Sequence, residues 1–453
     1  MKLWQKHTTS LREVEKFTVG NDREFDLLLA PFDIIGNIAH AKMLASVGLL
    51  TNEEATVLVQ ELREIYKRTQ PHDSPLEVGG FTIDKNIEDI HSQIEFLLTE
   101  KLGDVGKKIH SARSRNDQVL LDIKLFLRSE IEKLVNSIQS FFDLLIKKSE
   151  KHKEDLLPGY THLQLAMPSS FGLWFGAYAE SFVDDVITLK AAYDVVNKNP
   201  LGSAAGYGSS FPINRTMTTE LLGFADLNYN VVYAQMGRGK TERIVASALA
   251  NVADTLAKLS MDVTLYLNQN FGFISFPDEL TTGSSIMPHK KNPDVFELIR
   301  SQCNRIKALP NEIMMMTTNL PSGYHRDLQL LKEHLFPAFE TLQQCLQMAG
   351  FMLEKVEVKK NILDDDKYKY LFTVEEVNKL VMQGIPFRDA YKMIGEQVER
   401  NAFTPSPLER GGVRSHEGSI GNLCNDKIQA NMKNIFESFN FHQYHNAIEK
   451  LVG

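Results

Sequence analysis

Residues 281–294 read T-T-G-S-S-I-M-P-H-K-K-N-P-D and combine hydroxyl groups with lysines. The Gly-Ser-Ser triplet at 283–285 predicts a loop with free backbone N–H groups, and Lys290 follows it. Asn292 suits the cap of a helix and Pro293 its first position. Orphan N–H groups and the helix dipole both attract negative charge. The segment therefore predicts a site for a carboxylate, with a solvated surface loop as the alternative.

The segment S-A-R-S-R-N-D-Q at 111–118 is a second group of polar residues. Arg113, Arg115 and Asn116 supply many hydrogen-bond donors, which suit planar carboxylates. The alternative is a helix cap with Asp117 in the first turn. We expect both, because a cap alone does not need two arginines.

Two further segments carry polar residues without an obvious structural need. The first is P-G-Y-T-H-L-Q at 158–164, which contains His162, and the second is Y-H-R-D-L-Q at 324–329, which Lys332 follows. A lone histidine is more often a structural group, and a charged run is usually a solvated turn. A function for either segment needs further support.

That support is a resemblance to the argininosuccinate lyases of the fumarase/aspartase superfamily. All four segments are similar to signatures of that family, and the K-K-N-P-D ending and the S-R-S-R-N-D-Q string are the most specific to it. Shorter strings at 88–91, 103–106 and 384–390 also match. The resemblance runs from about residue 80 to about residue 395.

The resemblance implies a β-elimination that releases fumarate and arginine from argininosuccinate. Ser284 would be the base that removes a proton next to a carboxylate, although chemistry alone does not choose between it and Ser285. Lys290 would stabilise the carbanion. His162, paired with Glu297, would donate the proton to the leaving nitrogen or organise that donor.

The resemblance also implies a set of substrate-binding residues and a shared active site. We expect a homotetramer in which the segments of one site come from different subunits. The predicted substrate-binding residues are Arg113, Arg115, Asn116, Thr161, Asn292, Tyr324, Gln329 and Lys332.

Several positions depart from the family pattern. The opening L-W-G-G-R-F is changed at residues 3–8, His289 replaces a glutamine, and a substrate-binding serine expected shortly after Phe17 is missing. Residues 235–240, Q-M-G-R-G-K, replace a string like S-D-R-D-F, and Arg238 is a candidate for one lost charge. These changes leave open another fumarate-releasing C–N lyase, acting on an N-substituted aspartate or adenylosuccinate, or a catalytically silent, crystallin-like relative.

Long helices must position these segments. Apolar residues recur by threes and fours from Asp117 to about Lys148, again from Val245 to Val263, and after Pro293. No alternating strand pattern of useful length appears. We predict a mainly α-helical, fumarase/aspartase-like fold with helical domains at 1–110 and 361–453 around a central long-helix bundle at 111–360.

Composition narrows the functional class. The 453 residues are 43% hydrophobic and 24% charged, with a net charge of −8, which is ordinary for a globular protein. No basic patch suggests nucleic acid, and no apolar run approaches membrane-spanning length. Cys303, Cys345 and Cys424 fit no metal or disulfide spacing. We expect a cytoplasmic enzyme for a small-molecule substrate, with no metal or other cofactor.

Overall fold

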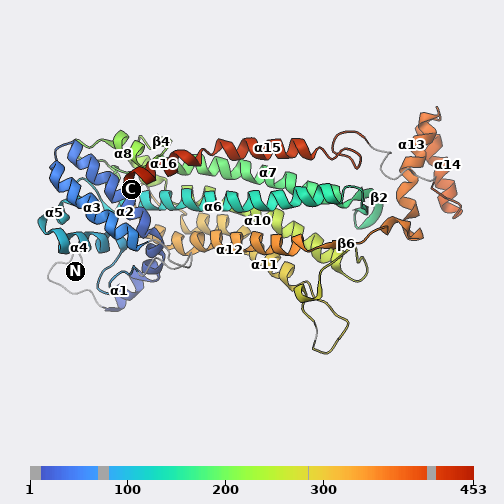
Figure 1. The fold of residues 1–453 in the computed structure, drawn as a ribbon, viewed down its shortest axis with the longest axis horizontal. Coiled ribbons are helices and arrows are strands. Elements are labelled where there is room, and N and C mark those ends of the chain that lie inside the picture. The colour runs from blue at the N-terminus through green and yellow to red at the C-terminus, as the bar shows by residue number, and fades with distance from the viewer. Residues whose placement is uncertain (1–11, 70–80, 284, 406–414) are drawn as a thin grey trace.

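The chain folds into long helices. The computed structural model describes residues 12–69, 81–283, 285–405 and 415–453, and these are mainly helical (Figure 1). The mainly α-helical fold that the sequence predicts is confirmed.

The N-terminal helices pack around an apolar core of their own, which includes Leu44, Leu58 and Ile94. This group lies at one end of the molecule (Figure 1). Its elements are α1 (Arg12–Val19), α2 (Asp22–Ser46), α3 (Asn52–Arg68), α4 (Ile90–Leu102), α5 (Asp104–Lys107) and the 3₁₀ helix η1 (Lys108–His110).

The centre of the molecule is a bundle of long helices with a continuous apolar core. Its helices are α6 (Arg115–Lys151), α7 (Phe171–Val196), α10 (Lys240–Leu267), α11 (Asp294–Met316) and α12 (Leu331–Glu354). The three predicted helices correspond to α6, α10 and α11. With 37 residues, α6 spans about 55 Å at a rise of 1.5 Å per residue.

The start of α11 differs from the prediction by one position. Pro293 is the residue before the helix, and the Asn292 side chain caps nothing. Instead, the backbone N–H of Asn292 donates to the Thr282 carbonyl at 2.8 Å. Asn292 therefore closes the base of the preceding loop.

Short helices and strands connect the long ones. The strands form antiparallel pairs β1 (Leu156–Thr161) with β2 (Gln164–Ser170) and β5 (Ile274–Ser275) with β6 (Glu357–Val358), and a parallel pair β3 (Lys198–Asn199) with β4 (Asp226–Leu227). The connecting helices are α8 (Arg215–Leu221), α9 (Val231–Met236), η2 (Asp278–Leu280) and η3 (Arg326–Leu330).

The β1–β2 hairpin is the element that the sequence did not predict. It joins the end of α6 to the start of α7, with Thr161 opposite Gln164. Its turn consists of His162 and Leu163, whose φ angles of 53° and 58° are both left-handed. Hairpin turns of this kind usually carry Asn or Gly, so His162 and Leu163 do not predict a turn here.

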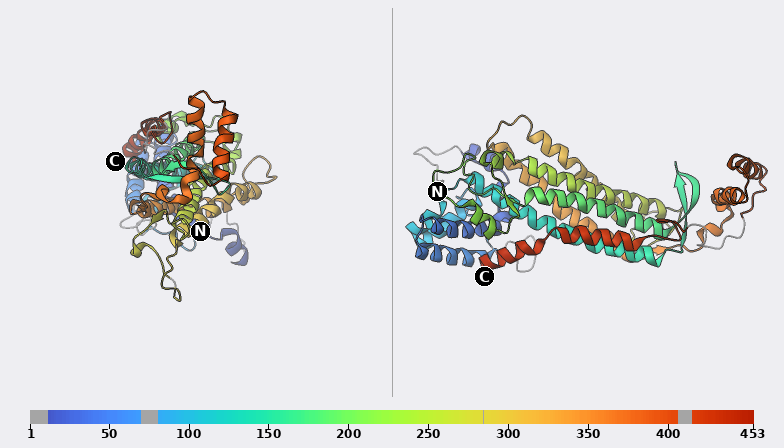
Figure 2. Two further views of the ribbon diagram at one scale, coloured as in Figure 1. Left: turned by 90° about the vertical axis from the view of Figure 1, so that its right-hand side faces the viewer. Right: turned by 90° about the horizontal axis from the view of Figure 1, so that it is seen from above.

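The C-terminal residues divide into two parts. The helices α13 (Thr373–Met382) and α14 (Phe387–Glu399) form a small cluster beyond the hairpin end of the bundle, while α15 (Asn425–Ser438) runs back along α7 and α16 (Phe441–Val452) reaches the N-terminal helices (Figure 2). The 3₁₀ helices η4 (Ile362–Asp364) and η5 (Asp366–Phe372) lead into this region. The predicted domain division at residues 110 and 360 stays a prediction.

The sequence predicts no apolar run of membrane-spanning length, but two helices of the described chain, α2 and α10, are long and apolar enough by composition to cross a bilayer. Most of the apolar window of each helix is buried inside the structure.

Candidate active site

A cavity of about 270 Å³ lies where the N-terminal helices meet the bundle. Residues from α2, α4, α6 and the segment before α12 converge on it, and most of them are charged or polar. The lining residues are Val19, Asp22, Asp26, Glu88, Asp89, His91, Arg115, Asn116, Val119, Arg238, Tyr324, Arg326, Gln329 and Lys332.

The first turn of α6 brings Arg115 and Asn116 to this cavity. Ser114 caps the helix, and its hydroxyl accepts from the backbone N–H of Asn116 at 3.2 Å. Asp117 completes a capping box with Ser114. Arg115 pairs with Asp89 at 3.0 Å. The predicted cap and the predicted polar cluster are therefore both present.

Arg113 is not among the residues that line the cavity. Its guanidinium donates to Asn37 Oδ1 at 2.6 Å and to the Ile109 carbonyl at 2.8 Å. These bonds hold the segment that carries Arg115. Direct contact between Arg113 and substrate stays a prediction.

The segment from Tyr324 to Lys332 closes another side of the cavity. Gln329 donates its amide N–H to the Thr18 carbonyl at 3.0 Å. Lys332 ends in an ion pair with Asp22 Oδ1 at 2.7 Å and another with Asp26 Oδ1 at 2.5 Å. Burial alone would lower the pKa of Lys332, but the two carboxylates raise it above its ordinary value.

The structure adds Asp22 and Asp26 to the site, and the sequence had singled out neither. Both lie on α2, in the region after Phe17 where the resemblance predicts a serine. Burial and the charge of Asp26 raise the pKa of Asp22 to about 6, although Lys332 opposes the rise. Asp22 lies in the first turn of α2, where carboxylates are common, so it gives no distinctive signal in the sequence.

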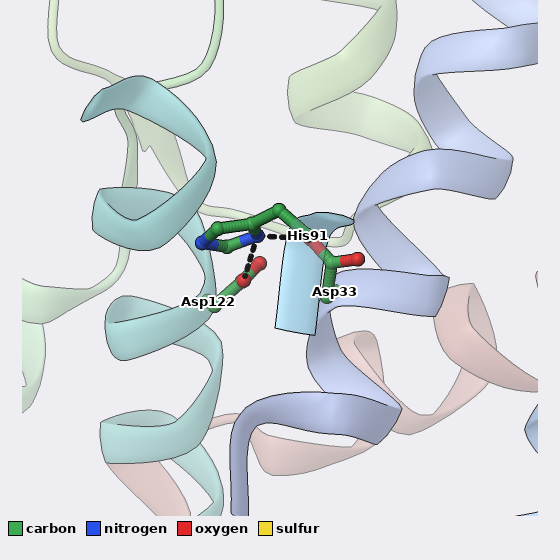
Figure 3. A group of neighbouring side chains, drawn as sticks. All are labelled: Asp33, His91 and Asp122. Atoms are coloured by element: carbon green, nitrogen blue, oxygen red, sulfur yellow. Dashed lines mark hydrogen bonds and ion pairs between the residues drawn. The ribbon is translucent and has the colours of Figure 1, made fainter. Parts of the chain in front are cut away.

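His91 lines the cavity. Two buried carboxylates, Asp33 from α2 and Asp122 from α6, lie beside its ring (Figure 3). Its Nδ1 is 2.7 Å from Asp33 Oδ1 and 3.5 Å from Asp122 Oδ2. Burial opposes a charge on the imidazole, but Asp33, Asp89 and Asp26 together outweigh it, so the pKa of His91 is raised. Burial and Asp33 raise the pKa of Asp122 well above its ordinary value.

Among the described residues, Asp33, His91 and Asp122 have possible metal-ligand atoms within 4.8 Å of one another, close enough to hold a metal ion. The hydrogen bond between His91 and Asp33 already uses the Nδ1 atom that would bind the ion. The hydrogen bond and ion pair between His91 and Asp33 account for the arrangement of this cluster.

Arg238 also reaches the cavity, from the changed segment at 235–240. Its Nε donates to Glu242 Oε1 at 2.8 Å, and its Nη2 donates to the Leu328 carbonyl at 2.9 Å. The side chain is buried, so these two bonds fix its position. Residues 3–8, the other changed segment, lie outside the described residues.

The β1–β2 hairpin places Thr161 and His162 far from the cavity of the same chain. Both residues are exposed at the tip of the hairpin. The hairpin follows the C-terminal end of α6, whereas Arg115 begins that helix (Figure 1). The length of α6, about 55 Å, separates the two segments.

The loop before α11 carries the remaining predicted groups away from the helices (Figure 1). Lys290 and Ser285 are exposed, and Ser284 lies outside the described residues. Glu297 is exposed in the first turn of α11, and in the described chain it makes no hydrogen bond or ion pair with His162. One chain therefore brings together Arg115, Asn116, Tyr324, Gln329 and Lys332 but not the predicted catalytic set.

Comparison with known proteins identifies related chains. A family model described as lyase matches residues 1–308. Argininosuccinate lyases from Bacteroides fragilis and Parabacteroides distasonis are each 58% identical to this chain, over 100% of it and 99% of their own length. An argininosuccinate lyase from Thermotoga neapolitana is 38% identical over 88% of this chain and 98% of its own.

Solved structures share the fold at lower identity. EDDS lyase in complex with formate superposes with a TM-score of 0.76 at 20% identity, over 98% of this chain and 95% of its own. A class II fumarase from Schistosoma mansoni gives a TM-score of 0.70 at 16% identity, over 98% of this chain and 97% of its own. These likenesses extend over almost the whole chain.

Proposed function

The chain belongs to the lyase family and, within it, to the argininosuccinate lyases, and we propose that its cavity binds argininosuccinate while other subunits complete the catalytic site. The enzyme is a carbon–nitrogen lyase that cleaves argininosuccinate reversibly into arginine and fumarate. The residue roles and the tetrameric assembly that follow are proposals.

The cavity supplies the substrate-binding part of the site. Asn116, Tyr324, Gln329 and Lys332 come from segments far apart in sequence, and all line one cavity. This convergence is the observation that carries the proposal. Arg115 adds a cation for the substrate's carboxylates, since a guanidinium binds a planar carboxylate through two parallel bonds.

Ser284, Lys290, His162 and Glu297 carry out the chemistry. The Ser284 oxygen, as an alkoxide, takes a proton from the succinyl carbon next to a carboxylate. The resulting dianion is stabilised by Lys290 and by backbone N–H groups of the loop. The C–N bond then breaks, fumarate forms, and the leaving nitrogen takes up a proton that His162 delivers or orders, with Glu297 behind it.

A homotetramer brings these groups to the cavity. Lys290, His162 and Glu297 are all exposed in the single chain, whereas stabilising a dianion needs a site with little water. Large apolar side chains are also exposed along the bundle, among them Leu298 and Met315 on α11. Association of helices from several subunits would cover this surface and join the hairpin and loop of neighbours to each cavity.

We propose a cytoplasmic location for the enzyme. Cys303 and Cys345 are buried free thiols, and Cys424 is a partly exposed one. Free cysteines without a disulfide partner are typical of proteins from a reducing compartment.

Parallel assays test the function. Fumarate absorbance is followed with argininosuccinate, adenylosuccinate, malate and aspartate as separate substrates. We expect fumarate from argininosuccinate, with arginine in equal amount, and none at a comparable rate from the others. Faster release from another substrate would assign a different C–N lyase, and no release from any of them would identify a catalytically silent relative.

A further inference from the structure

Asp22 and Asp26 share a single lysine in the cavity. Lys332 Nζ lies 2.7 Å from Asp22 Oδ1 and 2.5 Å from Asp26 Oδ1. Asp26 and Lys332 are almost fully buried, whereas the Asp22 side chain keeps 16% of its surface exposed and lines the cavity. All three residues line the cavity, and Asp22 presents the largest exposed surface to a ligand there.

The other described carboxylates of the cavity have arginine partners. Glu88 lies 3.2 Å from Arg326, and Asp89 lies 3.0 Å from Arg115. Arg238 is bound to Glu242, which is not among the lining residues. Asp22 thus shares a lysine that a second carboxylate already neutralises, and it gives this part of the cavity a surplus negative charge.

A surplus carboxylate in a partly buried site is costly unless it is protonated or meets a cation. The raised pKa of Asp22, about 6, reflects this cost, which arises from burial and from the charge of Asp26. At neutral pH the group is mainly ionised. A ligand cation next to it would be stabilised by a charge-assisted hydrogen bond.

Argininosuccinate carries such a cation beside a carboxylate. The amino-acid head of its arginine half has an ammonium and a carboxylate on one carbon. Asp22 and Lys332 present a carboxylate and an ammonium side by side. The carboxylate of Asp22 can therefore pair with the ligand's ammonium while the ammonium of Lys332 pairs with the ligand's carboxylate. The guanidinium of argininosuccinate also has a carboxylate beside it, on the succinyl carbon, so the analogue that lacks the α-ammonium group is needed to distinguish the two cations.

We propose that Asp22 is a specificity residue that binds the α-ammonium group of the arginine half, while Lys332 binds the α-carboxylate beside it. This inference rests on the proposed function and adds the recognition of the amino-acid head. It assigns to Asp22 a role in substrate selection, and none in the elimination itself.

The test compares two substrates in three proteins. The substrates are argininosuccinate and the analogue in which hydrogen replaces the α-ammonium group. The proteins are the wild type, Asp22→Asn, and the control Glu24→Gln, which removes a charge from an exposed residue of the same helical turn. Steady-state KM and kcat are measured for each combination.

We expect Asp22→Asn to raise KM for argininosuccinate roughly 10- to 100-fold with kcat changed less than about threefold, because a charge-assisted hydrogen bond is lost. The same substitution should change KM for the analogue by less than about threefold, and Glu24→Gln should change neither. An equal effect of Asp22→Asn on both substrates, or no effect on argininosuccinate, overturns the proposal. Thermal unfolding checks that the variant folds, and Asp22→Ser repeats the test with a smaller side chain.

A second measurement separates this inference from the proposed function. If the wild type releases no fumarate from argininosuccinate, the proposed function is wrong. Calorimetric binding of arginine and of 5-guanidinovalerate, which lacks the ammonium group, then tests Asp22 alone. Wild-type protein that binds the two equally, or that binds neither, contradicts the assignment, whereas a preference for arginine that Asp22→Asn removes supports it.

Discussion

Lys290, His162 and Glu297 carry charge or proton-transfer chemistry in the proposed reaction, yet each is exposed in the single chain. Solvent weakens the interaction of Lys290 with a developing dianion, because water screens charge far more than a closed site does. A site that excludes water would make the same groups much more effective. These residues can therefore act as proposed only if another subunit covers the loop before α11 and the β1–β2 hairpin.

Replacing the proposed base is the most direct test at this scale. We expect Ser284→Ala to reduce kcat by orders of magnitude, because the proton acceptor is lost, while argininosuccinate still binds. Ser285→Ala is the matched control in the same loop. Near-wild-type turnover in Ser284→Ala together with collapse in Ser285→Ala would move the base to the neighbouring serine.

Glu297→Gln tests the carboxylate behind His162. A carboxylate partner stabilises the charged imidazole, so its removal should favour the neutral imidazole, which cannot donate a proton, and shift the basic limb of the pH–rate profile to lower pH. The profile of kcat against pH is measured for both proteins. A profile that keeps its shape and position in the variant would remove Glu297 from the mechanism.

The raised pKa of Asp22 predicts a pH-dependent stability. The groups that face it are Asp26 on the same helix, Lys332 on α12 and, more weakly, Asp89. Because its native pKa is about 6 instead of 3.8, Asp22 keeps its proton in the native state over this range, and its ionisation makes the native state less stable as pH rises. This penalty is absent below about pH 4 and complete above about pH 6.

We therefore expect Asp22→Asn to raise Tm relative to the wild type near pH 7 and to lose this advantage near pH 4, since Lys332 keeps Asp26 as its partner. Thermal unfolding at several pH values measures the difference. Glu24→Gln, whose parent residue is exposed, should show no such trend. A Tm difference that is the same at both ends of the range would contradict the assignment of the shift.

At the scale of elements, the long helices were predictable and the hairpin was not. Apolar side chains recur along α6 and α10 for many turns, and this spacing predicts long amphipathic helices. The β1–β2 hairpin depends on a two-residue turn in which His162 and Leu163 adopt left-handed angles. Side chains with no preference for that conformation give no local signal, so the pairing of the strands decides the turn.

The contact between α6 and α7 gives a prediction at this scale. A Cβ atom at Gly172 would lie 2.6 Å from Lys153 Cα and 2.9 Å from the Ser149 carbonyl oxygen. These are backbone atoms, so Gly172→Ala should force the helices apart and cost about 1–3 kcal/mol. Urea unfolding, read as a shift of the midpoint at unchanged slope, measures the loss.

Gly395 on α14 is the matched control. A Cβ atom there would meet nothing within 4 Å, and alanine favours a helix by up to about 1 kcal/mol over glycine. Gly395→Ala should therefore be neutral or stabilising. Equal urea midpoints for the Gly172→Ala and Gly395→Ala variants would show that the close approach between α6 and α7 does not contribute to the free energy of unfolding.

At the scale of the whole molecule, α6 sets the distance between the two halves of the predicted site. The sequence predicts Arg115 and His162 at or near the ends of different long helices. In the structure Arg115 begins α6, and His162 lies in the hairpin between the end of α6 and the start of α7. The sequence could not reveal that Asp22, Asp26 and Arg238 join Lys332 and Arg115 at one cavity, because that convergence depends on packing between distant segments. Single-sequence patterns report local periodicity, and they do not report which helix ends meet.

The central claim is that each active site combines residues of different subunits, and subunit mixing tests it most directly. Inactive His162→Asn and inactive Ser284→Ala proteins are combined in equal amounts, denatured and refolded together. If the hairpin and the loop of one site come from different chains, about a quarter of the sites carry neither lesion, so about a quarter of the wild-type activity should return. Mixing Ser284→Ala with Lys290→Ala is the control, because both lesions lie in one loop and no site escapes them. If the first mixture stays as inactive as its parents while sizing shows tetramers, the shared site is contradicted.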